Sequence, residues 1–370
     1  MCKSALLLFV VLLNKAFICS AQVRQSDSIP VYPDMFYEYK IAALDKKTPL
    51  DLEYNPLVRK YIEKYTIERR VDVSKIMGLS KLYFPIFEEY LDKYNLPLEL
   101  KYLSVVESGL DPLAKSPSGA VGLWQFLLNT SHMFDLEVTS YIDERSDIYK
   151  STDAACKYFQ YLYHTFHDWN LVLAAYNGGP GVVRNAIERS GGKTNLWEIL
   201  PYLPEQTQNY VPAFIAMNYI LNYTSAHKIY ITEPAYNYHQ IDTVKVSYEM
   251  AFTQIIANIP INMEQLQFLN PQYKLKIIPE TGNKQLLILP SSLIKKYLNY
   301  ENRILVSNNK NTLNQPSTHN KKKIYIVCKG DFLHKIAMKN NCSLEEIKLW
   351  NKLSSDSISP GQKLIIYILD

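Results

Sequence analysis

Cysteine, glycine and long apolar runs are all scarce in this sequence of 370 residues. Five cysteines are too few for a small secreted fold that is held together by disulfides. The apolar run at residues 5–13 is too short to cross a bilayer as a helix, and no other run is long enough. The sequence therefore excludes a disulfide-rich scaffold and predicts no membrane-spanning helix.

A strong excess of charge of either sign is also missing. The 40 basic and 36 acidic residues give a net charge of +4, which is too balanced to indicate nucleic-acid binding. Hydrophobic residues make up 47%, so the chain can bury a sizeable core and is not disordered as a whole. Tyrosine is abundant, with 29 residues against 12 glycines, which suits sugar contacts and ordinary helix packing equally.

The first 21 residues resemble a cleavable export signal. Lys3 precedes the apolar run, and a small residue, Ala21, ends the segment two positions after Cys19. We therefore predict a signal peptide at residues 1–21 and a mature protein in the periplasm or elsewhere in the cell envelope. Lipid attachment at Cys19 is an open alternative, and membrane association is expected only if that cysteine is lipidated.

The hydrophobic pattern changes along the chain. Apolar residues first recur at helical spacings, as in Phe84, Phe87 and Leu91. Two later segments have the order strand, helix, helix, strand, and a segment rich in Asn, Ser, Thr and Lys separates them. The sequence predicts a multidomain α+β protein. Its expected parts are a mainly helical domain with an N-terminal extension at 22–228, a βααβ unit at 229–300, a flexible linker at 301–323 and a second βααβ unit at 324–370.

A single glutamate ends a mostly apolar helical stretch. Glu107 follows the run Leu-Ser-Val-Val, and Gly109 is a residue at which a helix often stops. Apolar neighbours and the C-terminal end of a helix both disfavour a carboxylate, so we predict a raised pKa for Glu107 if it is buried. A carboxyl that stays protonated near neutral pH serves as a general acid. An exposed glutamate on a last helical turn is the alternative.

Small residues dominate the next segment, 116–126. They let an extended polymer approach the backbone closely, while Trp124 offers a face for sugar stacking and Gln125 an amide for hydrogen bonds. A tight loop with a core tryptophan is the alternative. The glycines at 178–181 lack the preceding strand and the following Lys-Ser/Thr of a phosphate-binding loop, so nucleotide binding is not predicted.

Together these segments resemble the lytic transglycosylases of glycoside hydrolase family 23. Segments 143–147 and 205–212 are similar to the D branch of the membrane-bound members, and the resemblance spans about residues 50–225. It implies a lysozyme-like helical fold. The residues on which it rests, in chain order, are Glu107-Ser108, Ser116, Gly122-Leu123-Trp124-Gln125 and Ala175-Tyr176-Asn177.

The second βααβ unit resembles a LysM module, a fold that binds glycans containing N-acetylglucosamine. Phe332 stands where that family usually has threonine. The first unit looks like a degenerate relative without the Gly-Asp turn, and both glycan binding and a structural role are open for it. The glycan-binding residues that the resemblance implies are Gly330, Asp331, Phe332, Leu333, Asn351, Pro360 and Gly361.

The resemblance implies an enzyme that cleaves the β-1,4 bond between N-acetylmuramic acid and N-acetylglucosamine and closes a 1,6-anhydro ring. Glu107 would act first as acid and then as base, and Tyr176 would orient it. Peptidoglycan strands are the expected partner. The residues expected to bind substrate are Ser108, Ser116, Trp124, Gln125, Tyr176, Asn177 and Tyr210.

Two other functions are open. A hydrolytic muramidase of similar fold would use water in place of the C6 hydroxyl, with Asp111 or Asp153 as the carboxylate that positions it. A non-catalytic peptidoglycan-binding protein is the second, and the joint presence of Glu107, Ser116 and Gln125 disfavours it.

The remaining motifs favour structural roles. The charged cluster Asp143, Arg145 and Asp147 is predicted to form ion pairs and helix caps. No cofactor and no metal are expected, and the histidine pair at 164 and 167 is interpreted as an exposed polar face. Cys328 and Cys342 could pair, but sequence spacing does not show their geometry.

Overall fold

The structure is a computed structural model that describes residues 28–281, 284–311, 321–340, 342–353 and 355–368. The chain divides into two compact units, Met1–Tyr297 and Leu298–Asp370, and each is described by itself. The predicted signal peptide and Cys19 lie outside the described residues. No helix in the described ranges is both long and apolar enough to span a membrane.

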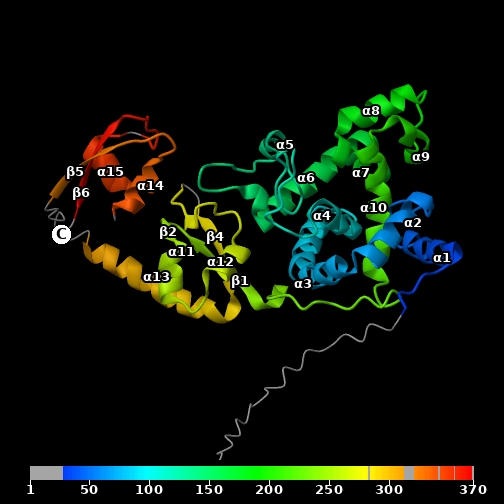
Figure 1. Cartoon of the computed structure of the whole chain (residues 1–370), viewed down its shortest axis with the longest axis horizontal. Helices are drawn as coiled ribbons and strands as arrows, with labels where there is room; N and C mark the ends of the chain where they lie inside the picture. Colours follow the sequence, from blue (N-terminus) through cyan, green and yellow to red (C-terminus); the bar gives the residue numbers. More distant parts are fainter. Residues whose placement is uncertain (1–27, 282–283, 312–320, 341, 354, 369–370) are drawn as a thin grey trace, which may run out of the picture. The chain divides into compact units, whose positions relative to one another are not determined.

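The first unit begins with the predicted helical domain (Figure 1). Short turns separate several of its helices: η1 (Lys64–Glu68), η2 (Leu98–Leu100), η3 (Glu144–Ser146) and η4 (Leu200–Tyr202). Its α-helices are α1 (Asp34–Asp45), α2 (Pro56–Glu63), α3 (Arg70–Lys93), α4 (Lys101–Ser108), α5 (Leu128–Met133), α6 (Ile148–Phe166), α7 (Trp169–Gly178), α8 (Pro180–Arg189), α9 (Leu196–Ile199) and α10 (Glu205–Asn222).

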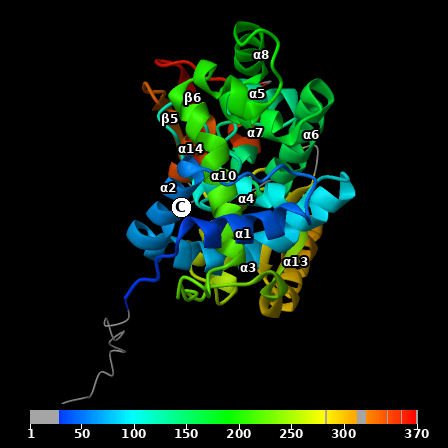
Figure 2. The same ribbon diagram turned by 90° about the vertical axis from the view of Figure 1, so that its right-hand side faces the viewer.

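Helix α10 is the centre of this domain. Every residue from Tyr210 to Ile220 is buried, and a helix that is buried all round belongs in a core. It contacts α1, α2, α4 and α7, which surround it in Figure 2. Because α4 and α7 both pack on α10, the end of α4 is brought near the end of α7.

Local sequence explains where the helices near the site begin and end. Gly109 ends α4 in the left-handed region at φ 62°, as the sequence predicts. Asp147 begins α6, because its carboxylate accepts hydrogen bonds from the backbone N–H groups of Tyr149 and Lys150. Asp168 caps the first turn of α7 in the same way.

A small βααβ unit follows within the same compact unit, after the short turn η5 (Tyr238–Gln240). Strands β1 and β4 pair antiparallel, with Ile241 opposite Pro290, and β2 and β3 form a second short pair. The predicted order is confirmed, with β2 and β3 in addition. Its elements are β1 (Ile241–Val246), β2 (Met250–Ala251), α11 (Phe252–Asn258), α12 (Met263–Leu269), β3 (Ile277–Ile278) and β4 (Gln285–Pro290).

The predicted linker is wrong over part of its length. Helix α13 (Ser291–Asn311) continues through residues 301–311, where the polar composition favours a flexible segment. Tyr297 and Tyr300, just before this segment, are buried at a helical spacing, and the helix continues beyond them. Residues 312–320 lie outside the described residues.

The second compact unit contains the second βααβ fold, with a core of its own. Strands β5 and β6 pair antiparallel, and Val327, Ile336 and Leu364 are buried beneath them. Cys156, Cys328 and Cys342 are free thiols, so the pairing that the sequence left open is not found. The elements are β5 (Lys321–Ile326), α14 (Leu333–Lys339), α15 (Leu344–Asn351) and β6 (Lys363–Ile368).

Gly78 provides a test of the packing. It lies inside α3, where alanine normally favours a helix, but an added Cβ would lie 2.1 Å from the carbonyl oxygen of Thr232. We expect Gly78→Ala to lower the free energy of unfolding by about 1–3 kcal/mol, measured by urea denaturation. Gly181→Ala, at an open position in α8, is the matched control and should change it little. Equal effects of the two changes would contradict this packing.

Candidate active site

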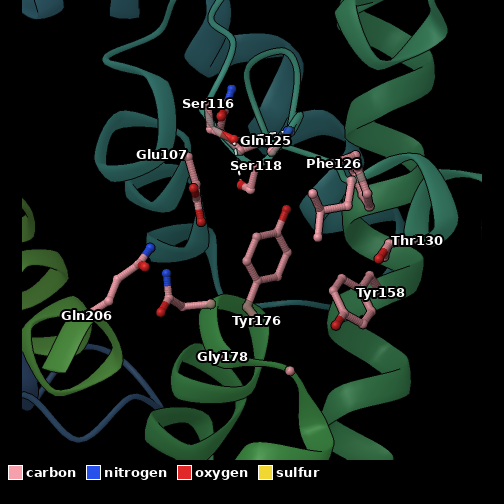
Figure 3. Close-up of a pocket in the computed structure, with 14 residues that line it drawn as sticks. Glu107, Ser116, Ser118, Gln125, Phe126, Thr130, Tyr158, Tyr176, Gly178 and Gln206 are labelled. Atoms are coloured by element: carbon pink, nitrogen blue, oxygen red, sulfur yellow. Dashed lines mark hydrogen bonds between the residues drawn. The ribbon is translucent and has the colours of Figure 1, made fainter. Parts of the chain in front are cut away.

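An open pocket with a volume of about 250 Å³ lies in the helical domain (Figure 3). It forms where the end of α4, the following loop and the end of α7 meet. Five of the predicted site residues line it, and they come from segments far apart in the chain. They are Glu107, Ser116, Gln125, Tyr176 and Asn177.

Glu107 lies on the last turn of α4. Burial raises the pKa of its carboxyl to about 7, from an ordinary value of 4.5. The Tyr210 hydroxyl donates a hydrogen bond to Glu107 Oε1, which lowers this pKa, but the effect of burial is larger. The predicted upward shift of this pKa is confirmed. Near neutral pH the protonated and the ionised forms of Glu107 are therefore both populated.

Glu107 is the only carboxylate among the described residues that line this pocket. Asp111 accepts a hydrogen bond from the backbone N–H of Leu113 and faces elsewhere. Asp153 is bound by Lys93 and other donors, also away from the pocket. The two carboxylates that the sequence offered as holders of a water are therefore not beside Glu107.

The hydrogen bond to Glu107 comes from a different tyrosine than predicted. Tyr176 lines the pocket, but its hydroxyl donates to the carbonyl of Trp124 at 2.7 Å, so the prediction that it orients Glu107 is wrong. Its ring stacks on Phe159 at 5.1 Å, which fixes that direction. The hydroxyl that contacts Glu107 belongs to Tyr210, which lines a neighbouring pocket that shares Gln206 with this one.

The loop from Ala114 to Phe126 forms one wall of the pocket. Ser116 Oγ accepts a hydrogen bond from the N–H of Ala120 and shares another with Ser118 Oγ at 2.8 Å. Gln125 has a left-handed backbone at φ 49°, and its amide nitrogen donates to two carbonyls of the same loop. Gln125 therefore faces the pocket while its own amide supports the turn.

Trp124 is not a sugar platform. It is fully buried, its indole Nε1–H donates to Thr152 Oγ1 at 3.0 Å, and its ring lies against Phe87 and Phe159. The prediction of a substrate-binding tryptophan is wrong. The alternative, a tight loop on a core tryptophan, is what the structure has, because an indole with all its faces covered has none left for a ligand.

Ser108 also differs from its prediction. Its hydroxyl donates to the carbonyls of Ser104 and Leu123, at 2.9 and 3.0 Å, and it does not line the pocket. These bonds fasten α4 to the loop. Ser108 therefore positions the wall relative to Glu107 and does not face substrate.

Sequence reasoning missed several pocket residues. Tyr158 lies on α6, where a helical pattern favoured packing, and Gln206 lies at the start of α10. The signal for Gln206 was available, because segment 205–212 resembles the family, yet only Tyr210 within it was given a role. Thr207 donates to Asn177 Oδ1 at 3.0 Å. The other missed lining residues include Ser118, Phe126 and Thr130 (Figure 3).

The charged cluster before α6 is structural, as predicted. Arg145 donates two hydrogen bonds to the Asp143 carboxylate, at 2.8 and 2.9 Å. Asp147 caps α6. Within the residues that the structure describes, no group of three or more potential ligands is placed to hold a metal ion.

In the second βααβ unit the predicted glycan residues separate into exposed and structural ones. Leu333 is a core residue that is 1% exposed. The Asn351 side chain joins α15 to β6, because it donates a hydrogen bond to the Ile365 carbonyl and accepts one from the Ile365 N–H. Both residues were predicted to bind glycan, and in the structure neither side chain faces a ligand. Asp331 holds its turn by accepting from Tyr325 and Cys328. All seven except Leu333 are exposed or half-exposed, and those without such a structural side-chain bond are Gly330, Phe332, Pro360 and Gly361.

Three protein families match the chain. Residues 85–197 match the Transglycosylase SLT domain, residues 240–305 match the family described as "Lytic transglycosylase MltD, LysM-like domain", and residues 325–366 match the LysM domain. The SLT match contains Glu107 and every predicted pocket residue up to Asn177, but not Tyr210.

Two similar proteins agree with these matches. The chain is 28% identical over 333 residues to membrane-bound lytic murein transglycosylase D of Escherichia coli K12, covering 88% of this chain and 72% of the relative. It is 28% identical to the soluble lytic murein transglycosylase of that organism, over 40% of this chain and 24% of the relative.

A solved structure is similar as well. The 70 kDa soluble lytic transglycosylase of Escherichia coli matches at 27% identity with a TM-score of 0.34, over 42% of this chain and 27% of that one. The family matches and the relatives make this chain a lytic transglycosylase with an SLT domain. Its particular likeness is to the D-type members, because an MltD-type LysM-like domain and a LysM domain follow the SLT domain.

The buried carboxyl predicts a pH-dependent effect on stability. Because the folded pKa of Glu107 is about 7 against 4.5, ionisation favours the unfolded chain as pH rises between these values. We expect Glu107→Gln to raise the free energy of unfolding by about 1–3 kcal/mol at pH 8 and by little at pH 4. Urea denaturation at both pH values measures this.

The exposed Glu188 on α8 supplies the matched control. Glu188→Gln should leave the difference between the two pH values unchanged from that of the wild type. If Glu107→Gln behaves like this control, the carboxyl is not held in a desolvated site.

Proposed function

We propose that the pocket cleaves the β-1,4 bond between N-acetylmuramic acid and N-acetylglucosamine, with Glu107 as both acid and base. The observation that supports this is a single carboxyl with a pKa of about 7, without a second carboxylate among the described lining residues. Hydrolysis with inversion or retention ordinarily uses two carboxylates. One carboxyl suffices when the nucleophile is a hydroxyl of the substrate itself.

The proposed reaction balances without water. Protonated Glu107 gives its proton to the glycosidic oxygen while the bond from that oxygen to the anomeric carbon of the muramic acid breaks. The C6 hydroxyl of the same sugar attacks the anomeric carbon, and the Glu107 carboxylate takes the hydroxyl proton. The products are a 1,6-anhydro-muramic end and a free N-acetylglucosamine end, and Glu107 is again protonated.

Tyr210 is proposed as a positioning residue. Its hydroxyl donates to Oε1 of Glu107, which fixes the rotation of the carboxyl and favours the charged form. It lines the neighbouring pocket, which shares Gln206 with the pocket of Glu107. Its bond holds the pKa of Glu107 below the value to which burial alone would raise it.

The other pocket residues are proposed to bind the glycan. Ser116, Gln125 and Tyr176 lie around the space in front of Glu107 (Figure 3), and Asn177 also lines the pocket. Hydroxyl and amide groups at these positions suit the acetamido and hydroxyl groups of the two sugars. Ser108 and Trp124 support this wall from behind.

Targeting to the cell wall is proposed for the LysM domain. The turn at Gly330 and Asp331 and the turn at Pro360 and Gly361 are adjacent, because the N–H of Gly361 donates to the carbonyl of Val327 at 2.7 Å. We propose that these turns bind the glycan through their backbone groups. Export by residues 1–21 to the periplasm, with lipidation of Cys19 as the alternative, is proposed on the sequence pattern alone.

The first test is the product. Full-length protein is incubated with purified sacculi, and the released muropeptides are analysed by mass spectrometry. We expect 1,6-anhydro-muropeptides from the wild type and at least a 1,000-fold lower rate from Glu107→Gln, because no other carboxyl in the described pocket can replace the acid. Glu188→Gln should retain full activity. Reducing-end products alone would indicate a muramidase, and an active Glu107→Gln would exclude Glu107 as the acid.

The second test concerns Tyr210. The rate should fall as pH rises above about 7, because Glu107 must start protonated. Tyr210→Phe removes a bond that lowers this pKa, so we expect the alkaline limb of the pH–rate profile to move to higher pH. Tyr176→Phe removes a hydroxyl bound to Trp124 and should leave the limb in place. A shift in the opposite direction for Tyr210→Phe would contradict the assigned bond.

A further inference from the structure

The LysM-like domain touches the helical domain at a place that bears on the pocket. Residues 141–143 of the loop before α6 lie antiparallel to residues 272–274, between α12 and β3. Ile142 pairs with Tyr273, and each is 1% exposed. This contact lies inside one compact unit, Met1–Tyr297, and we call it the ribbon.

Backbone hydrogen bonds hold the ribbon. The N–H of Asp143 donates to the carbonyl of Gln272 at 2.9 Å, and the N–H of Lys274 donates to the carbonyl of Tyr141 at 2.8 Å. Two bonds that flank one residue pair are the pattern of a short antiparallel ladder. The Lys274 ammonium adds a bond to the carbonyl of Thr139 at 2.8 Å.

The LysM-like side of the ribbon is firmly fixed. The Tyr273 hydroxyl donates to the carbonyl of Leu286 in β4 at 2.6 Å, and its ring lies edge-on to Phe252 of α11 at 6.0 Å. A displacement of the ribbon would therefore have to move the small core of this domain, which is close-packed.

On the side of the helical domain, two buried charged residues, Asp143 and Arg145, connect the ribbon to the pocket wall. Asp143 accepts a two-pronged pair of hydrogen bonds from Arg145, and both residues are 8% exposed. The third guanidinium nitrogen, Nη1, donates to the carbonyls of Gly119 and Phe126, at 3.1 and 3.3 Å. A planar guanidinium bound on both sides fixes the distance and angle between the groups it joins.

The backbone of Arg145 also presses directly on this wall. A Cβ at Gly122 would lie 1.9 Å from the Arg145 carbonyl oxygen, so the two chains meet as closely as glycine allows. The wall at residues 115–126 carries Ser116 and Gln125, which face the pocket.

We propose that the LysM-like domain braces the substrate-facing wall of the active site, through the ribbon, Asp143 and Arg145. The proposal rests on the proposed function of the pocket. Arg145 and Asp143 are positioning residues, since neither lines the pocket. Glu107 lies on α4 and is not part of the braced loop, so the brace controls how the glycan is aligned and leaves the proton chemistry of Glu107 unchanged.

The test uses full-length protein and two changes at one position. Lys274→Pro removes the N–H that donates to Tyr141, whereas Lys274→Ala keeps it and loses only the contact with Thr139. We expect Lys274→Pro to lower kcat/KM on soluble glycan strands by about 10- to 100-fold, because small misplacements at a catalytic site are costly. Lys274→Ala should stay within about 3-fold of the wild type on the same scale.

Two further measurements distinguish a specific effect on the pocket wall from a general loss of structure. Hydrogen exchange of residues 115–126, followed by mass spectrometry, should be about tenfold faster in Lys274→Pro, because local opening becomes easier. The alkaline limb of the pH–rate profile should stay near 7, because Glu107 is untouched.

Arg145→Lys gives a second route if Lys274→Pro does not fold. It keeps the positive charge but loses the planar guanidinium. As for Lys274→Pro, we expect a lower kcat/KM, faster hydrogen exchange at residues 115–126 and an unchanged alkaline limb. Unchanged kcat/KM in the folded variants would overturn the proposal, as would lower activity without faster exchange at 115–126. Failure of the proposed function would appear elsewhere, as lytic activity that survives in Glu107→Gln.

Discussion

Removing one carboxyl from water is the constraint on which the rest of this site depends. Burial raises the pKa of Glu107 and the hydrogen bond from Tyr210 lowers it, and the net result is a pKa of about 7. The apolar run of α4, the left-handed stop at Gly109 and the fully buried helix α10 all serve to place this carboxyl at the edge of an open pocket. A second glutamate in the pocket would change the pKa of Glu107, because its negative charge would disfavour the ionised form of Glu107.

The supporting side chains act on backbone more than on ligand. The hydroxyls of Ser108 and Tyr176 each donate a hydrogen bond to a carbonyl of the loop that faces Glu107. The side-chain amide of Gln125 donates a hydrogen bond to another carbonyl of the same loop. Trp124 fixes the loop on α6 from inside the core. The residues by which the family resemblance is recognised are thus largely those that build a rigid wall, and a rigid wall is what the alignment of an extended glycan requires.

Much of the fold followed from the sequence because helical periodicity and stop signals are local. Glu107, its raised pKa and four other pocket residues were predicted, but the partner of Glu107 was not. Tyr176 and Tyr210 are alike in sequence, and only the packing of α7 and α10 decides which hydroxyl reaches the carboxyl. Trp124 and Leu333 were assigned to ligands because no local pattern reveals that tertiary contacts bury them, and the bond of Asn351 to Ile365 was hidden in the same way. The helix at 301–311 was missed because its polar composition is typical of a linker, while the buried tyrosines of α13, Tyr297 and Tyr300, precede it.

The central claim is that Glu107 is held as a neutral acid near neutral pH. Carbon-13 NMR of protein labelled at the glutamate side-chain carboxyls, with Glu107→Gln to assign the resonance, measures the titration of this group directly. A midpoint near pH 7 is the predicted result. A midpoint at the ordinary value of 4.5 would contradict it, because a carboxyl ionised throughout the neutral range could not serve as the acid of the proposed reaction.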